Sequence, residues 1–190
     1  MSPSSSSVHS NVDQSSSSMR SNVDQHNSTA TGTLELLLCF DSNGRHIDRK
    51  KLWKKNNSEY KRCATLHRVS EEIKNLQYKD IQHILLSVGT NDLDTKDYDQ
   101  VLGELKLLIN DVRAKYPKVK FIINEFLPRN DARNGEVEKF NFHLEKFANL
   151  QQDITVASQA DLNDVSVLSD SKHLLPDKVP RYAKNIIKAF

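Results

Sequence analysis

Three short polar motifs contain side chains that together could carry out nucleophilic catalysis. They are Asp41-Ser42-Asn43-Gly44, Gly89-Thr90-Asn91-Asp92 and Asp170-Ser171-Lys172-His173. A serine hydroxyl becomes a good nucleophile when a histidine, itself oriented by a carboxylate, removes its proton. An asparagine amide can donate a hydrogen bond to the oxyanion that forms during acyl transfer. The three motifs therefore supply a nucleophile, a base, an orienting acid and an oxyanion donor.

Each motif also has an ordinary structural interpretation. Asp, Ser, Asn and Gly all favour turns, so DSNG alone predicts a turn. GTND alone predicts a loop between a strand and a helix, with Asn91 or Asp92 as the cap. DSKH alone is typical of a solvated loop. The catalytic interpretation depends on whether the fold brings the three motifs together.

The apolar pattern after residue 32 predicts a parallel sheet covered by helices. Four nearly continuous apolar runs, as expected of buried parallel strands, occupy residues 34–40, 81–88, 119–127 and 154–157. Residues 60–66 are a more polar candidate for an edge strand. Apolar residues at helical spacing occupy residues 69–76, 102–116, 137–147 and 182–190. This alternation predicts an α/β three-layer sandwich of flavodoxin-like size with a central five-stranded parallel sheet.

This architecture gives the motifs a common location. DSNG follows the first strand, GTND follows a central strand, and DSKH precedes the last helix. Ligands of such sheets bind beyond the carboxyl ends of the strands, so all three motifs are expected on one rim.

The order and context of the motifs resemble the SGNH (GDSL-type) hydrolase superfamily, over residues 33–190. The resemblance implies the SGNH hydrolase fold and a serine esterase that needs no cofactor. It implies Ser42 as nucleophile, His173 as base and Asp170 as orienting acid. It also implies that the Ser42 backbone N–H and the Asn91 side chain donate to the oxyanion.

Two positions depart from the family pattern. Phe40 stands where the family has a glycine before Asp-Ser, and the stretch 62–67 (RCATLH) lacks the glycine whose N–H joins the oxyanion hole. The backbone N–H of Ala64 or Thr65 is expected to replace it. A missing donor would cost on the order of 10²–10³ in rate.

The expected reaction is hydrolysis of a small acyl, acetyl or lipid ester through an acyl–serine intermediate. Because a histidine must be neutral to act as a base, activity is expected to rise through roughly pH 6.5, the ordinary imidazole value. No metal is expected, since the seven histidines form no HExxH or other ligand spacing.

Charge near the first motif suggests further contacts. The stretch 45–68 is rich in Lys and Arg with Trp53 and Tyr60 between them. It is either a solvated surface or a basic rim for an anionic substrate, an anionic lipid or a nucleic acid. Arg45 and Arg129 are candidate residues of the substrate rim. Arg129 and Glu125 are expected near that rim, where they either touch substrate or form a surface ion pair.

A narrower resemblance links the chain to the esterase-type domain in first-open-reading-frame proteins of LINE retrotransposons. It rests on the chain length, the serine-rich lead-in and Leu127-Pro128-Arg129. Residues 1–32, in which SNVDQ occurs at 10–14 and again at 21–25, are predicted to be a disordered tail.

Composition excludes several classes of protein. The net charge of +2 is too small for a polycationic protein, and two cysteines do not make a disulfide scaffold. No transmembrane segment and no signal peptide are recognised, so a cytoplasmic or nuclear location is expected. The alternatives to an esterase are a catalytically silent SGNH-fold binding module and a nucleic-acid-associated module derived from a retrotransposon.

Overall fold

Five strands form one parallel sheet in the computed structural model, which describes residues 32–53 and 57–190. The strand order is β2-β1-β3-β4-β5, and every neighbouring pair is parallel. The strands are β1 (Thr33–Phe40), β2 (Ser58–Arg62), β3 (Asp80–Ser87), β4 (Lys120–Asn124) and β5 (Ile154–Ala157). This is the flavodoxin-like order. The predicted tail, apart from Gly32, lies outside the described residues.

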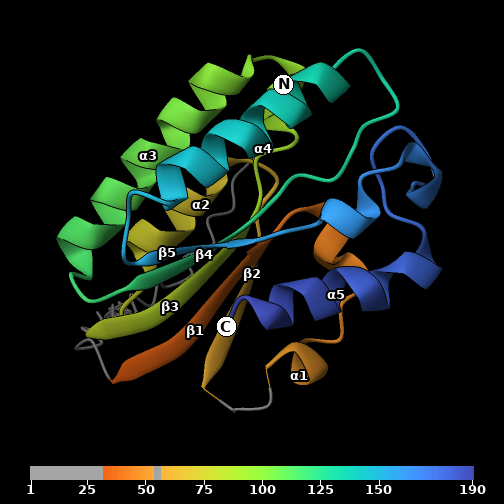
Figure 1. Ribbon diagram of the computed structural model, residues 1–190. Coiled ribbons are helices and arrows are strands. Elements are labelled where there is room, and N and C mark those ends of the chain that lie inside the picture. The colour runs from red at the N-terminus through yellow and green to blue at the C-terminus, as the bar shows by residue number, and fades with distance from the viewer. Residues whose placement is uncertain (1–31, 54–56) are drawn as a thin grey trace, which may run out of the picture.

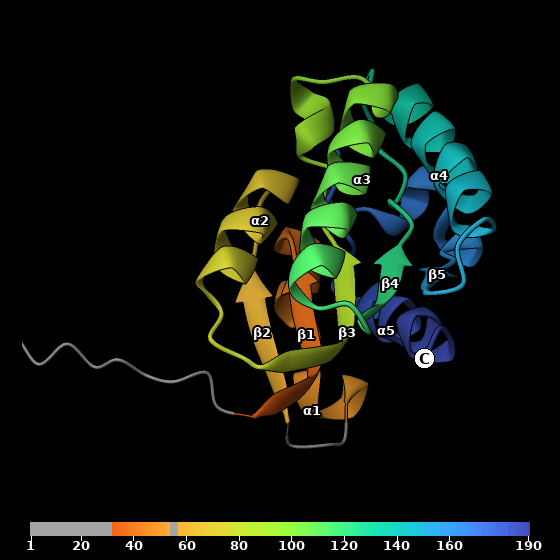
Figure 2. The same ribbon diagram turned by 90° about the vertical axis from the view of Figure 1, so that its left-hand side faces the viewer.

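Helices cover both faces of the sheet (Figures 1 and 2). They are α1 (Arg49–Leu52), α2 (Leu66–Asn75), α3 (Tyr98–Lys115), α4 (Asn134–Ala148) and α5 (Val179–Lys188). The helices α2, α3 and α4 pack on one face, and α1 and α5 pack on the other. The three-layer sandwich predicted from the alternating pattern is therefore confirmed.

Alternate residues of each strand feed two separate cores. In β1, Leu37 and Cys39 face the core under α2, α3 and α4, whereas Leu36, Leu38 and Phe40 face the core under α5. Because both faces are buried, the strands read as continuous apolar runs rather than as an alternating pattern.

Element boundaries differ from the predicted ones where local hydrogen bonds stop or start an element. Helix α2 begins at Leu66, ahead of the predicted residue 69, because the Thr65 side chain caps it by accepting a hydrogen bond from the Arg68 amide. For the same reason β2 ends at Arg62 instead of continuing to residue 66. The short helix α1 was not predicted.

Candidate active site

The turn that carries Ser42 follows β1 directly and begins the short 3₁₀ helix η1 (Ser42–His46). The Asp41 carboxylate caps η1 by accepting a hydrogen bond from the Asn43 amide at 2.9 Å. Phe40, in place of the family glycine, is fully buried and stacks on Tyr60. Gly44 makes room for it, since a Cβ at that position would lie 2.4 Å from the Phe40 side chain. The departure at Phe40 is thus accommodated within the turn.

A continuous chain of hydrogen bonds joins the first and last motifs. The Ser42 Oγ lies 2.9 Å from His173 Nε2, and His173 Nδ1 lies 2.7 Å from Asp170 Oδ2. The two motifs are 131 residues apart in sequence. With this geometry His173 can take the serine proton on Nε2 while Asp170 fixes its tautomer.

Asp170 also organises the loop that holds His173. Its Oδ1 accepts hydrogen bonds from the backbone amides of Lys172 and His173, both at 2.8 Å. The Lys172 amide, the His173 side chain and the His173 amide together lower the pKa of Asp170 to about 2. The carboxylate therefore stays ionised throughout the pH range in which a histidine base is active.

Asn43 holds His173 in place and was missed as a site residue by the sequence analysis, which interpreted it as part of a turn. Its side chain is buried, donates to the Lys172 carbonyl at 3.3 Å and accepts from the Leu174 amide at 2.9 Å. It thus binds the residues on both sides of His173. Nothing in a single sequence distinguishes this role from an ordinary turn asparagine.

Replacing Asn43 with alanine is expected to lower kcat roughly 10- to 100-fold with a small change in KM, because His173 loses its alignment with Ser42. The buried Leu174 amide would also lose its acceptor, at a cost of about 1–3 kcal/mol of stability. Steady-state kinetics and urea unfolding check both effects. Unchanged kcat in a destabilised variant would show that Asn43 serves stability only.

Three backbone amides and one side chain in the turns after β1, β2 and β3 are the candidate oxyanion donors. The N–H groups of Ser42, Ala64 and Thr65 donate to no acceptor within the described parts of the chain. The Asn91 Nδ2 donates one hydrogen bond to the Ala64 carbonyl at 3.0 Å and so joins the loop after β3 to the loop after β2. The second hydrogen of that amide remains for a ligand.

The GTND loop is shaped by the residues around Asn91. Gly89 has a φ of +125°, and a Cβ there would lie 2.7 Å from the Phe126 ring, so only glycine fits. Asp92 accepts a hydrogen bond from the Leu66 amide at 3.1 Å. It therefore helps to cap α2. Asn91 occupies the N-cap position of the short 3₁₀ helix η2 (Asp92–Asp94), as expected, but its side chain makes no capping hydrogen bond there, and α3 is capped by Asp97 instead.

The two arginines predicted for the substrate rim have different surroundings. Arg129 is 4% exposed, and its guanidinium binds Asp94, Asp131 and the Thr90 carbonyl. It is a buried ion-pair residue, and its contact with substrate stays a prediction. Arg45 is exposed on η1, three residues after Ser42, and donates to His46 at 2.8 Å.

Asp94 links the loop after β3 to the loop that carries His173. One of its oxygens binds Arg129 at 2.6 Å and the other binds Lys172 at 2.9 Å. The Asn130 amide also donates to the Ser171 carbonyl at 2.8 Å. These contacts hold the loop that carries His173 against the loops that follow β3 and β4.

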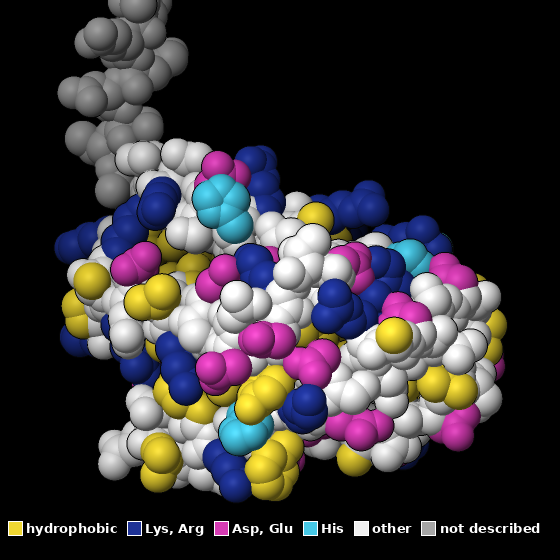
Figure 3. All heavy atoms as spheres, turned by 90° about the horizontal axis from the view of Figure 1, so that it is seen from above, with side chains coloured by type: hydrophobic (Ala, Val, Ile, Leu, Met, Phe, Trp, Pro, Cys, Tyr) yellow, Lys and Arg dark blue, Asp and Glu magenta, His cyan; other side chains and the backbone are white. Residues whose placement is uncertain are grey.

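Acidic partners neutralise several of the basic side chains in the stretch 45–68. Lys61 binds Glu59 and Glu72 at 2.8 and 3.2 Å, and Arg68 binds Glu71 and Glu72. In Figure 3, acidic, basic and histidine side chains are intermingled on the face seen from above. That face does not present a continuous basic rim; Lys54 and Lys55 lie outside the described residues.

Asp41, next to the nucleophile, is a buried carboxylate. It is 4% exposed, and burial raises its pKa from 3.8 to about 6, against the opposing effect of the Asn43 amide. Between these values the folded chain binds more protons than the unfolded chain, so stability falls as pH rises. Above pH 6 the ionised carboxylate costs the fold up to about 3 kcal/mol.

Asp41→Asn is therefore expected to be more stable than the wild type at pH 7.5, by about 1–3 kcal/mol, and to lose this advantage as pH falls toward 4. Urea unfolding at the two pH values measures the difference. The exposed Asp111 on α3 provides a control for loss of one negative charge, as Asp111→Asn. An equal gain from Asp41→Asn at both pH values would contradict the burial effect.

Among the described residues, no group of three or more His, Cys, Asp or Glu side chains is placed to hold a metal ion. Within the same residues, no helix has the length and apolar character needed to cross a bilayer.

Solved structures share this fold, although comparison of sequences finds no match. No family model matches the chain, and no curated protein matches it significantly. A member of the lipolytic protein G-D-S-L family from Veillonella parvula superposes with a TM-score of 0.65 at 18% identity, over 84% of this chain and 98% of the other.

Two further structures extend the comparison. The catalytic domain of a Streptococcus pneumoniae peptidoglycan O-acetyltransferase, solved with a methylsulfonyl adduct, has a TM-score of 0.62 at 15% identity, with 85% and 93% coverage. A GDSL-like lipase from Bacteroides thetaiotaomicron has a TM-score of 0.59 at 14% identity, with 83% and 89% coverage. The chain therefore has the SGNH (GDSL-type) hydrolase fold, as the resemblance of its motifs predicted.

Proposed function

We propose that the protein is a serine hydrolase that cleaves small acyl, acetyl or lipid esters through an acyl–serine intermediate. The observation that carries this proposal is the unbroken hydrogen-bond chain from Ser42 through His173 to Asp170. Solved neighbours named as esterases and lipases support the same class of reaction.

In the first half of the reaction, Ser42 Oγ attacks the ester carbonyl carbon as His173 Nε2 accepts the hydroxyl proton. The negative charge that develops on the carbonyl oxygen is met by the free amides of Ser42, Ala64 and Thr65 and by the Asn91 side chain. The tetrahedral intermediate then collapses, and His173 returns the proton to the departing alcohol.

In the second half, water attacks the acyl–serine carbonyl and gives its proton to His173. Collapse of the second tetrahedral intermediate releases the carboxylic acid, and the proton on His173 returns to Ser42 Oγ. Ser42, His173 and Asp170 are then in the protonation states in which they began. Whichever of Ala64 and Thr65 replaces the family glycine needs to supply only a backbone N–H in this scheme.

Hydrolysis of p-nitrophenyl esters with acyl chains from acetyl to octanoyl tests the proposal. The wild type is expected to release p-nitrophenol with saturation kinetics, and the preferred chain length will separate small-acyl from lipid esters. If no chain length is hydrolysed faster than by Ser42→Ala, the binding-module alternative replaces the esterase.

A further inference from the structure

A small cavity of about 10 Å³ lies behind the turn that carries Ser42. Asp41 and Asn43, the residues on either side of the nucleophile, both line it, and the other walls come from the ends of β3 and β4, the loops after them, and α5. All ten lining residues are buried, and none is more than 8% exposed. The cavity therefore lies inside the fold and has room for one water molecule and little more.

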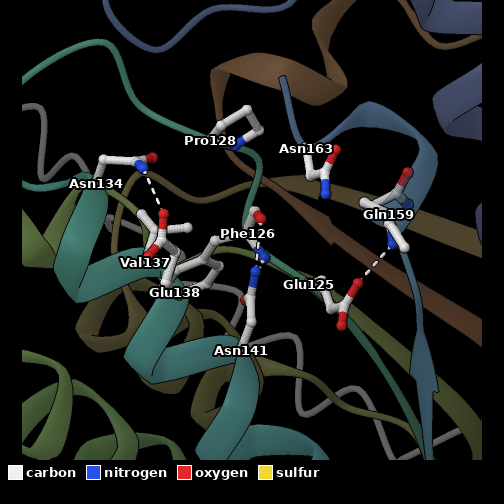
Figure 4. A pocket seen from close by; sticks show the side chains of 10 residues that line it. Glu125, Phe126, Pro128, Asn134, Val137, Glu138, Asn141, Gln159 and Asn163 are labelled. Atoms are coloured by element: carbon white, nitrogen blue, oxygen red, sulfur yellow. Dashed lines mark hydrogen bonds between the residues drawn. The ribbon is translucent and has the colours of Figure 1, made fainter. Parts of the chain in front are cut away.

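One wall of this cavity is shared with a larger pocket outside it. Glu125 and Phe126 line both spaces, and Figure 4 shows them in the larger one. Hydrogen bonds hold this wall in place, since the Gln159 amide donates to the Glu125 carboxylate at 2.6 Å and the Phe126 amide donates to the Asn141 side chain at 2.9 Å. The small cavity is thus bounded by a fixed wall.

Two hydroxyl groups on the walls have one hydrogen more than they can use on each other. The hydroxyls of Ser87 and Tyr182 share a hydrogen bond, in which one donates and the other accepts. Asn124 Nδ2 donates to the Tyr182 oxygen at 3.0 Å and to the Glu125 carbonyl at 2.8 Å. Whichever hydroxyl donates in the shared bond, the hydrogen of the other has no acceptor among the described residues.

The Asp41 carboxylate offers the matching acceptor. Its Oδ1 accepts from the Asn43 amide at 2.9 Å, whereas its Oδ2 accepts from no donor in the described chain. Oδ2 is not among the buried atoms sealed from water, so a water molecule can reach it. Burial, and next the charge of Asp41, raise the pKa of Tyr182, as expected of groups that face each other across a small space. Neither hydroxyl is hydrogen-bonded to Asp41 directly.

We propose that this cavity binds one structural water molecule, which accepts the remaining hydroxyl hydrogen of the Ser87–Tyr182 pair and donates to Asp41 Oδ2. Thr90, on the same walls, supplies a hydroxyl as a third partner, and ordered internal waters have two to four such partners. A water in this position gives each buried group its hydrogen bond at a small entropic cost. It links the turn that carries Ser42 to α5, and its presence does not depend on ester hydrolysis.

A high-resolution crystal structure of the wild-type protein at pH 7.5 tests the proposal directly. One fully occupied water is expected in the cavity, at about 2.6–3.0 Å from Asp41 Oδ2 and from the hydroxyl oxygen of Ser87 or Tyr182. An empty cavity would overturn the proposal. A direct hydrogen bond between the Asp41 carboxylate and either hydroxyl, with no space left between them, would overturn it as well.

A variant that fills the cavity provides a second measurement, in solution. Ser87→Thr keeps the hydroxyl and adds one methyl group at the end of β3, so it is expected to displace the water. Deuteron magnetic relaxation dispersion counts long-lived internal waters, and the wild type is expected to hold one more than Ser87→Thr. Ser171→Thr makes the same change at an exposed position and should leave the count unchanged. Equal counts in the wild type and Ser87→Thr would contradict the proposal, and the wild-type crystal structure decides it if Ser87→Thr does not fold.

Discussion

Replacing Ser42 with alanine is expected to lower kcat for p-nitrophenyl acetate by a factor on the order of 10⁴–10⁶, to the rate given by the oxyanion hole and binding alone. The reason is that no other hydroxyl lies within hydrogen-bonding distance of His173 Nε2 among the described residues. KM should change little, because the serine bonds to the substrate only after binding. Steady-state kinetics at pH 7.5 measure both constants.

Ser171 supplies the matched control for this substitution. It is exposed, lies two residues before His173, and holds the loop through its backbone carbonyl, which accepts from the Asn130 amide, rather than through its hydroxyl. Ser171→Ala should therefore keep wild-type activity. Equal activities of the wild type and Ser42→Ala would contradict the nucleophile assignment.

Asp170→Asn is expected to lower kcat by a factor on the order of 10³–10⁴. The asparagine oxygen can still accept from the amides of Lys172 and His173, which preserves the loop. Its NH₂ group, however, would face His173 Nδ1 and favour the tautomer that carries the proton on Nε2. That tautomer cannot accept the proton of Ser42.

Two comparisons separate this tautomer effect from loss of charge. Asp177→Asn removes an exposed carboxylate from the neighbouring 3₁₀ helix η5 (Pro176–Lys178) and should leave kcat unchanged. The pH profile adds a second readout: because Asp170 titrates near pH 2, the acidic limb of the wild-type profile cannot come from it. A fall in kcat of similar size in both variants would mean that net charge, rather than the orientation of His173, matters.

The fold could be predicted because both sheet faces are buried and four of the five strands are recognisable apolar runs; the polar edge strand β2 (SEYKR) was placed at 60–66 rather than at Ser58–Arg62. Residues 154–157 were predicted as the strand that β5 occupies. Strand ends were harder, since they depend on side-chain caps such as Thr65 and on the course of the chain after Asn124. Residues 125–127, though apolar in part, lie beyond β4 and shape the rim.

The site was predictable only where a residue type limits the chemistry. Ser42, Asp170 and His173 could be proposed together because acyl transfer needs those three groups, and the structure places them in contact. Asn43 could not be, because its partners are backbone atoms 129 and 131 residues away. The partners of Arg129 could not be named, because a sequence does not reveal that Asp94 reaches it.

Some sequence-based expectations remain predictions. They include the link to LINE retrotransposon proteins, contact with nucleic acid or anionic lipid through residues 45–68, and a cytoplasmic or nuclear location. A steep loss of single-stranded RNA binding with rising salt would support the nucleic-acid contact.

Covalent labelling with a fluorophosphonate tests the nucleophile most directly, because the reagent reacts only with a serine activated by its base. Intact-mass spectrometry of the wild type is expected to show one adduct, and peptide mapping should place it on Ser42. Ser42→Ala should stay unlabelled, and His173→Ala should label far more slowly than the wild type. An unlabelled wild type, or an adduct that persists in Ser42→Ala, would contradict the assignment of Ser42 as the catalytic nucleophile.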